Sequence, residues 1–254
     1  MASVKRYAGF LQQSKTPSDQ RTIILPKTSP APEQTPVTMT WTLISATPSP
    51  YARKVRIALQ EKGIPFTLQT EVPWDSTTKT PDHNPLEKLP VLILDDGKTA
   101  IYESHFILEW LEAKYPDPPL LPPASDVDAR LFAKQVEVVC DGVCDALVLA
   151  FFEKQREVQS EPWSARQMRK ADGGLRQLNT WLEQSGSGKF LINDRLSLAD
   201  LAAGSMLGWM AIRWTDHPWR TQYPGLSKYY EGLETLQSFK DTRPSPQTMK
   251  DKIV

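Results

Sequence analysis

A serine hydroxyl stands in a short segment where the local structure can bring it next to an anion. In Thr47-Pro48-Ser49-Pro50-Tyr51 two prolines flank Ser49, and an amphipathic pattern begins directly after them. Pro50 suits the first turn of a helix, because the N–H that proline lacks would have no partner there. Ser49 then precedes a helix N-terminus, where unpaired backbone N–H groups and the helix dipole favour negative charge. The segment predicts that Ser49 caps the helix, holds an anion, or does both.

The helix after Ser49 belongs to an α/β pattern between residues 41 and 114. Apolar alternation and turn residues predict strands and helices, with strands at 42–45, 64–70, 90–94 and 99–101 and helices at 50–62 and 104–114. Gly63 is expected to end the first helix, and Asp95-Asp96-Gly97 to form a hairpin turn. Arg53, Lys54 and Arg56 are expected mostly in solvent. The order of elements predicts a compact α/β unit.

Strand signals stop after a proline-rich stretch, and the rest of the chain reads as helical. Helices are expected at 126–156, 164–184, 197–212 and 226–239. The inward face of the first of these is expected to carry Leu131, Val138, Val139, Val143, Leu147 and Phe151. Ser197 to Asp200 has the spacing of a capping box. The predicted organisation is an extension at 1–38, an α/β domain at 39–118, a linker at 119–125, an all-helical domain at 126–244 and a loose tail at 245–254.

The composition narrows the class of protein. The 254 residues hold 30 basic and 30 acidic side chains, so no clustered basic surface for nucleic acid is expected. Only two cysteines occur, Cys140 and Cys144, which disfavours a disulfide framework and suits a reducing compartment. The longest apolar run, Ala146 to Phe152, is too short to span a membrane. The sequence predicts a soluble, cytoplasmic protein.

The first 38 residues differ from the rest of the chain. They hold five basic residues against two acidic ones, and five prolines among many serines and threonines. Such a segment buries too little apolar surface to offset the entropy lost on ordering. A disordered extension is predicted, and an organelle transit peptide stays open as the alternative.

Four segments together resemble the cytosolic glutathione S-transferases, in particular the serine-type tau class and related bacterial and fungal transferases. They run from Ser49 to Arg56, from Asn84 to Leu92, over Glu103-Ser104, and from Ser197 to Asp200. Each segment alone is unspecific, but they agree in order and spacing over about four-fifths of the chain. The resemblance implies a thioredoxin-like N-terminal domain followed by an all-helical C-terminal domain.

The resemblance also implies which anion Ser49 meets. In serine-type transferases the hydroxyl at this position hydrogen-bonds the glutathione sulfur and favours the thiolate, the form that attacks an electrophile. Ser49 is therefore the predicted catalytic residue, with glutathione as co-substrate and no metal. The residues expected to bind glutathione are Lys88, Leu89, Pro90, Glu103 and Ser104.

Each of these residues has an expected partner on the tripeptide. A cis Leu89–Pro90 bond, as in the family, would turn the Leu89 backbone toward the cysteinyl unit. The Ser104 hydroxyl and its helix N-terminus would receive the γ-glutamyl carboxylate, and Glu103 the ammonium. A lysine that reaches the glycyl carboxylate in one large class is missing from residues 73–76. Three residues stay open as substitutes: Lys79, His83 and Lys88.

The electrophile that the thiolate attacks is expected to be small and hydrophobic. Helix 126–156 and three residues, Tyr51, Asp145 and Trp209, are predicted to shape its pocket. A homodimer is implied by the resemblance alone. Conjugation is the predicted activity; glutathione-dependent peroxide reduction and a non-enzymatic ligand-binding or regulatory role stay open. A serine rather than a cysteine at position 49 disfavours thiol–disulfide exchange, and the sequence does not separate detoxification from biosynthesis.

Overall fold

The computed structural model of the chain describes residues 40–186 and 188–252. The chain divides into two units, residues 1–38 and residues 39–254, and the elements named below all belong to the second unit. The predicted disordered extension, residues 1–38, lies outside the described residues.

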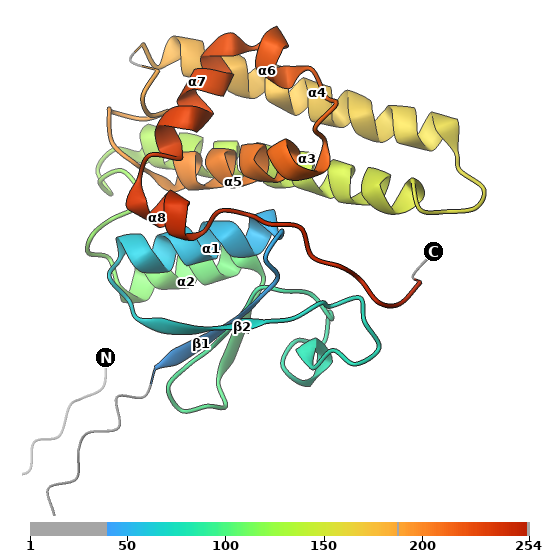
Figure 1. Ribbon diagram of the computed structural model, residues 1–254. Helices are drawn as coiled ribbons and strands as arrows, with labels where there is room; N and C mark the ends of the chain where they lie inside the picture. Colours follow the sequence, from blue (N-terminus) through green and yellow to red (C-terminus); the bar gives the residue numbers. More distant parts are fainter. Residues whose placement is uncertain (1–39, 187, 253–254) are drawn as a thin grey trace, which may run out of the picture. The chain divides into compact units, whose positions relative to one another are not determined.

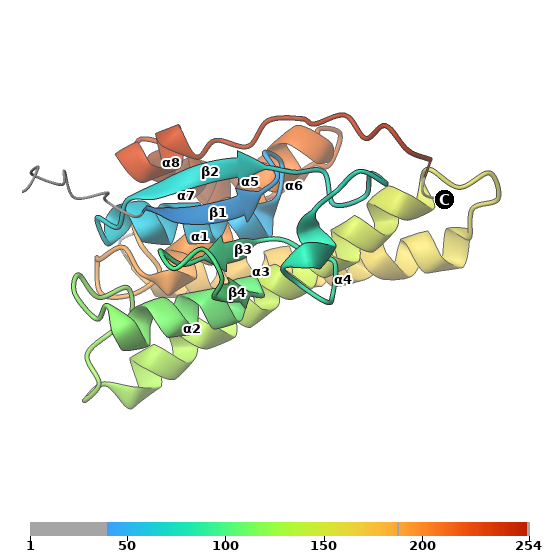
Figure 2. The same cartoon turned by 90° about the horizontal axis from the view of Figure 1, so that it is seen from below.

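A four-stranded sheet forms the first half of the described chain (Figures 1 and 2). Its strands are β1 (Trp41–Ser45), β2 (Phe66–Thr70), β3 (Val91–Ile93) and β4 (Ala100–Tyr102), in the order β2-β1-β3-β4. β1 and β2 are parallel, and the other neighbours are antiparallel. Helices α1 (Pro50–Glu61) and α2 (Ser104–Lys114) cover one face of the sheet (Figure 1). This arrangement is the thioredoxin-like fold that the sequence predicts.

The turns of this half follow from residue types that the sequence shows. Gly63 follows α1 with φ +64°, and Gly97 sits in the β3–β4 hairpin with φ +67°. Glycine has no Cβ, so it adopts this left-handed conformation without strain. Both predicted turn positions are confirmed. A short 3₁₀ turn, η1 (Thr80–Asp82), lies in the stretch between β2 and β3 that the sequence leaves irregular.

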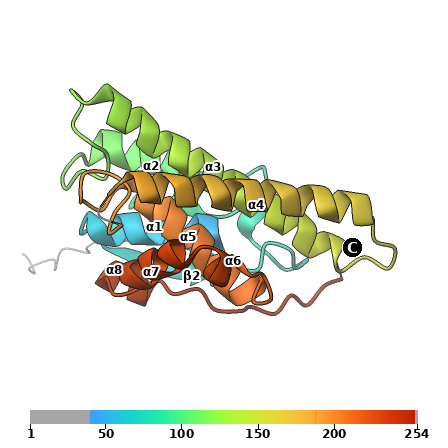
Figure 3. The same ribbon diagram turned by 90° about the horizontal axis from the view of Figure 1, so that it is seen from above.

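The second half is all helical, as predicted. Its helices are α3 (Val127–Glu153), α4 (Glu161–Gln184), α5 (Leu198–Arg213), α6 (Trp219–Gln222), α7 (Pro224–Leu233) and α8 (Gln237–Asp241). α3 and α4 form a long pair beside α5 (Figure 3). The predicted last helix, 226–239, is split into α7 and α8 because Leu236 has an extended backbone, with ψ 144°. No helix within the described ranges is long and apolar enough to cross a bilayer.

Helix α5 is buried along nearly its whole length, and a carboxylate fixes its start. Asp200 is fully buried and accepts hydrogen bonds from the backbone N–H groups of Ser197 and Leu191, both at 2.9 Å. The Ser197 and Tyr229 hydroxyls donate to the same carboxylate, at 2.9 and 2.8 Å. The predicted capping box is therefore present, and it also ties α5 to the loop before it and to α7.

The inward face of α3 is predicted correctly only in part. Val143 and Leu147 are buried as expected, but Leu131 and Val138 are 60% and 62% exposed. Apolar side chains occur on more than one side of this helix, so periodicity alone does not separate its buried positions from its exposed ones. The packing against α4 and α5 decides which side faces the core.

The expectation that Arg53, Lys54 and Arg56 lie in solvent is wrong. All three are buried, with exposed fractions of 0%, 1% and 6%. Helix α1 lies between the sheet on one side and helices α2, α5 and α8 on others, so it has no solvent face. The cations must therefore find partners inside the protein or remain unpaired.

Arg53 has a full set of partners. Its guanidinium forms an ion pair with Glu234 at 2.6 Å and donates to the carbonyls of Gly204 and Phe239 at 3.2 and 3.1 Å. Gly208 makes room for it, since a Cβ at this position would lie 2.1 Å from Arg53 Nη1. A buried arginine that is paired in this way joins α1 to α5, α7 and α8.

Arg56, unlike Arg53, is buried with part of its guanidinium group unpaired. Its Nε and Nη2 are buried, and neither has a hydrogen-bond partner among the described residues. Burial, together with the like charge of Arg53, lowers the pKa of Arg56 to about 10. Desolvating a cation without a partner costs free energy of folding.

Replacing Arg56 with methionine should therefore stabilise the protein, by about 1–2 kcal/mol in the free energy of unfolding. Methionine fills a similar space without a charge to desolvate. Urea unfolding measures the effect, with Arg53→Met as the matched variant that should destabilise. Equal losses for the two variants would contradict the assignment of Arg56 as unpaired.

Residues 245–252 belong to the predicted loose tail, and they form no helix or strand. This segment, which we call the C-terminal strap, hydrogen-bonds to both halves of the described chain. Its composition is polar and suggests a free end, but backbone groups supply several of its contacts. Such contacts leave no mark in a side-chain pattern.

Candidate functional site

The strand register brings the three predicted ligand-binding segments to one edge of the sheet. Ile44 pairs with Val91, and Val91 pairs with Tyr102. The turn after β1, the residues before β3 and the residues after β4 therefore lie side by side. These are the segments that carry Ser49, Leu89 and Glu103-Ser104.

Ser49 is the N-cap of α1, as the sequence predicts. Its Oγ accepts a hydrogen bond from Ala52 N–H at 3.2 Å, and its own N–H donates to the carbonyl of Ala46 at 3.1 Å. The side chain is half-buried. Because the cap uses Oγ as an acceptor, the hydroxyl proton is still free to point at a ligand. Capping and anion binding are therefore compatible at this residue.

The peptide bond between Leu89 and Pro90 is cis. Within the described part of the chain, neither the N–H nor the C=O of Leu89 has a hydrogen-bond partner. Asn84 holds this loop from behind: it is buried, donates to the Lys88 carbonyl at 2.6 Å and accepts from Leu86 N–H at 2.9 Å. The side chain of Lys88 is exposed. The loop thus offers an open backbone edge that an extended peptide can pair with.

Glu103 and Ser104 form the start of α2. Glu103 has a left-handed backbone, with φ +73°, and its carboxylate accepts from the N–H groups of His105 and Phe106 at 3.1 and 3.0 Å. Ser104 is buried, and its hydroxyl lies 3.4 Å from a Glu103 oxygen. The Glu103 carboxylate therefore already occupies two of the N–H groups that a bound carboxylate would use. A bound carboxylate would meet the N–H of Ser104 and its hydroxyl, which donates to the Glu103 carboxylate over a long 3.4 Å.

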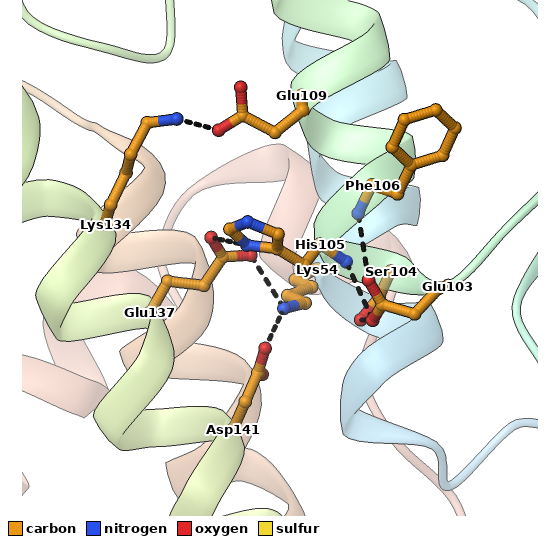
Figure 4. Close-up of polar contacts among 9 residues, drawn as sticks. All are labelled: Lys54, Glu103, Ser104, His105, Phe106, Glu109, Lys134, Glu137 and Asp141. Atoms are coloured by element: carbon orange, nitrogen blue, oxygen red, sulfur yellow. Dashed lines mark hydrogen bonds and ion pairs between the residues drawn. The ribbon is translucent and has the colours of Figure 1, made fainter.

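A buried ion network lies behind this turn (Figure 4). Lys54 donates to Glu137 at 2.8 Å and to Asp141 at 2.5 Å, both on α3. Glu137 is 1% exposed and also pairs with His105 Nδ1 at 2.7 Å. His105 follows Ser104 in the chain. The network therefore ties α1 and the start of α2 to the helical half.

The charges in this network shift one another's pKa values. Burial raises the pKa of Asp141 to about 6, and the attraction of Lys54 opposes that rise. Burial alone would lower the pKa of Lys54, but its two carboxylate partners outweigh this effect and raise it. The ammonium is thus charged at neutral pH because it has two partners.

The residues predicted for the acceptor pocket separate into two groups. Tyr51 donates a very short hydrogen bond from its hydroxyl to Asp145, next to the Ser49 turn, so these two are together. Burial, with Cys144 and Asp145 adding to it, raises the pKa of Tyr51. Trp209, by contrast, is 5% exposed within the main hydrophobic cluster. Its ring is occupied by packing, which leaves little surface for a ligand.

The described residues contain neither a cluster of metal ligands nor a reactive cysteine. No group of three or more potential metal ligands occurs between residues 40 and 186 or between 188 and 252. Both cysteines are free and buried, and burial raises the pKa of each thiol. Neither cysteine is therefore a nucleophile in the folded protein.

Several residues that shape the site have no role in the sequence prediction. They are Lys54, Asn84, His105 and Glu137. The sequence contains one pattern that could have predicted the ion network. The acidic residues Glu137, Asp141 and Asp145 recur every four positions on a largely apolar helix. Such spacing puts all three on one face and indicates cationic or hydroxyl partners opposite.

Comparisons with known proteins agree with the geometry. The family model described as "Glutathione S-transferase, N-terminal domain" matches residues 48–114, and "Glutathione S-transferase, C-terminal domain" matches residues 161–232. A crystal structure of a glutathione S-transferase from Methylobacterium radiotolerans, in complex with glutathione sulfonate, is 53% identical, with a TM-score of 0.80. The match covers 85% of this chain and all of that one.

Two curated relatives are similar over most of their length. The uncharacterized GST-like protein YibF of Escherichia coli is 31% identical, over 80% of this chain and 98% of that protein. A probable maleylacetoacetate isomerase of Drosophila melanogaster is 30% identical, over 81% of this chain and 82% of that protein.

Proposed function

Because the chain belongs to the cytosolic glutathione S-transferase superfamily, we propose that it transfers the glutathione thiolate to small hydrophobic electrophiles, with Ser49 activating the sulfur. The hydroxyl of Ser49 donates to the sulfur and favours its charged form. The positive end of the α1 helix dipole further favours the thiolate over the thiol. The product is a thioether conjugate of glutathione.

The observation that carries the proposal is the position of the Ser49 hydroxyl. It lies half-buried at the start of α1, on the sheet edge where the unpaired backbone of Leu89 and the start of α2 also lie. A tripeptide paired with Leu89 and anchored at Ser104 would bring its cysteinyl unit toward this turn. The exposed Lys88 is proposed for the glycyl carboxylate, since its loop lies on the same edge.

The experiment that tests the proposal is a turnover assay with glutathione and a panel of acceptors. An aryl halide should be conjugated faster than in the uncatalysed reaction, at a rate that saturates with glutathione. Glutathione binding without turnover on any acceptor would instead favour a ligand-binding or regulatory role. Reduction of an organic hydroperoxide in the same panel tests the peroxidase alternative.

A second candidate activity is cis–trans isomerisation of an unsaturated diketo acid. The fly relative named a probable maleylacetoacetate isomerase supports this candidate, at 30% identity. The same thiolate serves it, because reversible addition to a double bond allows rotation before elimination. In that case glutathione would be required but not consumed, which separates the two reactions in one assay.

A homodimer and a cytoplasmic location are also part of the proposal. Exposed apolar side chains on α2 and α3, namely Phe106, Leu131 and Val138, support a contact with a second copy. Single apolar side chains are common on surfaces, but these three lie on two helices that the ion pairs His105–Glu137 and Lys134–Glu109 join. Sedimentation of the purified protein gives the oligomeric state.

A further inference from the structure

One face of α3 carries a column of acidic side chains with partners on helix α1. Its members are Glu137, Asp141 and Asp145, each four residues from the next, so all three lie on the same face. The first two share the Lys54 ammonium, at 2.8 and 2.5 Å (Figure 4). His105 also pairs with Glu137, at 2.7 Å. The cationic partners of the column are therefore gathered at its first two carboxylates.

Asp145, the third member of the column, has a neutral partner instead. Within the described ranges its carboxylate forms no ion pair, and the hydroxyl of Tyr51 donates a hydrogen bond to it. Burial raises the pKa of Tyr51, so the phenol stays protonated and brings no charge of its own. The Asp145 side chain is exposed. Asp145 is therefore a carboxylate whose negative charge no described side chain neutralises.

Tyr51 holds this charge at the turn that carries Ser49. Tyr51 lies in the first turn of α1, two residues after Ser49, which caps the same turn through the N–H of Ala52. The hydrogen bond from Tyr51 joins this turn to α3. The Asp145 carboxylate is thus in direct contact with a side chain of the turn at which the proposed thiolate binds.

An apolar hollow continues the same face of α3 beyond Asp145. Leu149 and Phe152 follow Asp145 by four and seven residues, which places all three on one side of the helix. The hollow has a volume of about 470 Å³, and its apolar lining residues are Leu149, Phe152, Val158 and Trp163. Glu153 and Arg156 also line it, but they pair with each other at 3.5 Å. Along this face, the charge without an ionic partner is that of Asp145.

We propose that Asp145 selects against acceptors that carry a negative charge, so that the electrophiles of this protein are uncharged; this rests on the proposed function. Tyr51 is the positioning residue, because its hydroxyl holds the carboxylate at the Ser49 turn. An anionic acceptor that approaches the sulfur beside this pair is repelled by a like charge. The diketo acid of the isomerase candidate is such an anion, so the inference favours conjugation over isomerisation.

Two aryl chlorides of nearly the same shape but different charge test this role. They are 4-chloro-3,5-dinitrobenzamide, which is neutral, and 4-chloro-3,5-dinitrobenzoate, which is an anion. In both reactions the glutathione sulfur forms a bond to the ring carbon, and chloride leaves. Each kcat/KM is divided by the rate constant of the uncatalysed reaction, and the ratio of the two quotients gives the preference for the carboxamide. Both acceptors meet the same thiolate, so an effect of Asp145 on glutathione itself cancels in this ratio.

Three variants separate the charge from its position. Asp145→Asn removes the charge and keeps an oxygen that can accept from Tyr51, whereas Tyr51→Phe keeps the charge and removes the hydrogen bond that holds it. Asp128→Asn is the matched control. It removes a carboxylate from an exposed position of the same helix, about 25 Å from Asp145 along the axis.

The wild-type protein should prefer the carboxamide, and Asp145→Asn should lower this preference about three- to tenfold. Tyr51→Phe should give a value between those two, and Asp128→Asn should keep the wild-type value. Salt at about 0.5 M should lower the preference of the wild type but not that of Asp145→Asn, because salt screens exposed charges.

An unchanged preference in Asp145→Asn, or an equal fall in Asp128→Asn, would overturn the inference. A wild-type preference in Tyr51→Phe would overturn the positioning role of Tyr51. If neither aryl chloride reacted faster than without the protein, the proposed function itself would fail. Turnover of the carboxamide with the same preference in every variant would overturn only the role of Asp145.

Discussion

Replacing Ser49 with alanine is expected to lower kcat/KM for conjugation by about 100- to 1,000-fold, the effect of removing one preorganised donor from a developing or bound anion. The loss of activity should come mainly from a smaller fraction of bound glutathione in the thiolate form. The pKa of bound glutathione should rise toward the value of a free thiol, roughly 8.5. The ultraviolet absorbance of the thiolate, followed against pH, measures that shift directly.

A control is needed because Ser49 also caps α1. Losing the cap costs about 1 kcal/mol of stability, so the alanine variant must be assayed well below its unfolding temperature. Ser49→Thr keeps a hydroxyl at the same position and should retain part of the activity. Undiminished turnover of Ser49→Ala with unchanged glutathione affinity would refute the role of Ser49.

Replacing Lys54 with methionine is expected to lower the free energy of unfolding by about 3–5 kcal/mol. The change removes the shared partner of Glu137 and Asp141 and leaves two carboxylates facing each other in a buried place. Lys134→Met is the matched control, since its ion pair with Glu109 is about one-third exposed on both sides and should contribute less than about 1 kcal/mol. Urea unfolding compares the two, and similar losses would contradict the buried network.

The Lys54→Met defect should also depend on pH. The pKa of Asp141 in the folded protein is about 6, above its ordinary value of 3.8, and losing Lys54 raises it further. The folded state then binds more protons than the unfolded state in this window, so stability falls as pH rises through it. The deficit of the variant should be largest above pH 6 and shrink on acidification.

The parts of the fold that the sequence predicts correctly are those set by local chemistry. Ser49 and Pro50 begin a helix, and Gly63 and Gly97 take left-handed turns, because each effect acts within a few residues. The capping box at Ser197 is local in the same sense. Local chemistry is therefore enough to locate the turn that carries Ser49 and the edge of the sheet beside it.

The parts that the sequence misses depend on contacts between distant segments. Arg53, Lys54 and Arg56 read as a solvated face, because nothing within α1 shows that the sheet and several helices enclose it. The strap reads as loose because its partners Thr47 and Asp75 lie about 170 to 200 residues away. Trp209 reads as a pocket wall because an aromatic ring suits a ligand site as well as a core.

The burial of Cys140 and Cys144 bears on how the protein survives its proposed substrates. A protein that gathers electrophiles risks alkylation of its own thiols. These are the only two cysteines of the chain, both are enclosed between α3 and its neighbours, and burial keeps both protonated. Under the proposed function, the reactive thiolate at the site would belong to glutathione alone, which would leave with the product. Such an arrangement would spare the protein from alkylation by its own substrates, and a thiol-reactive dye would label it only when the helical half opens.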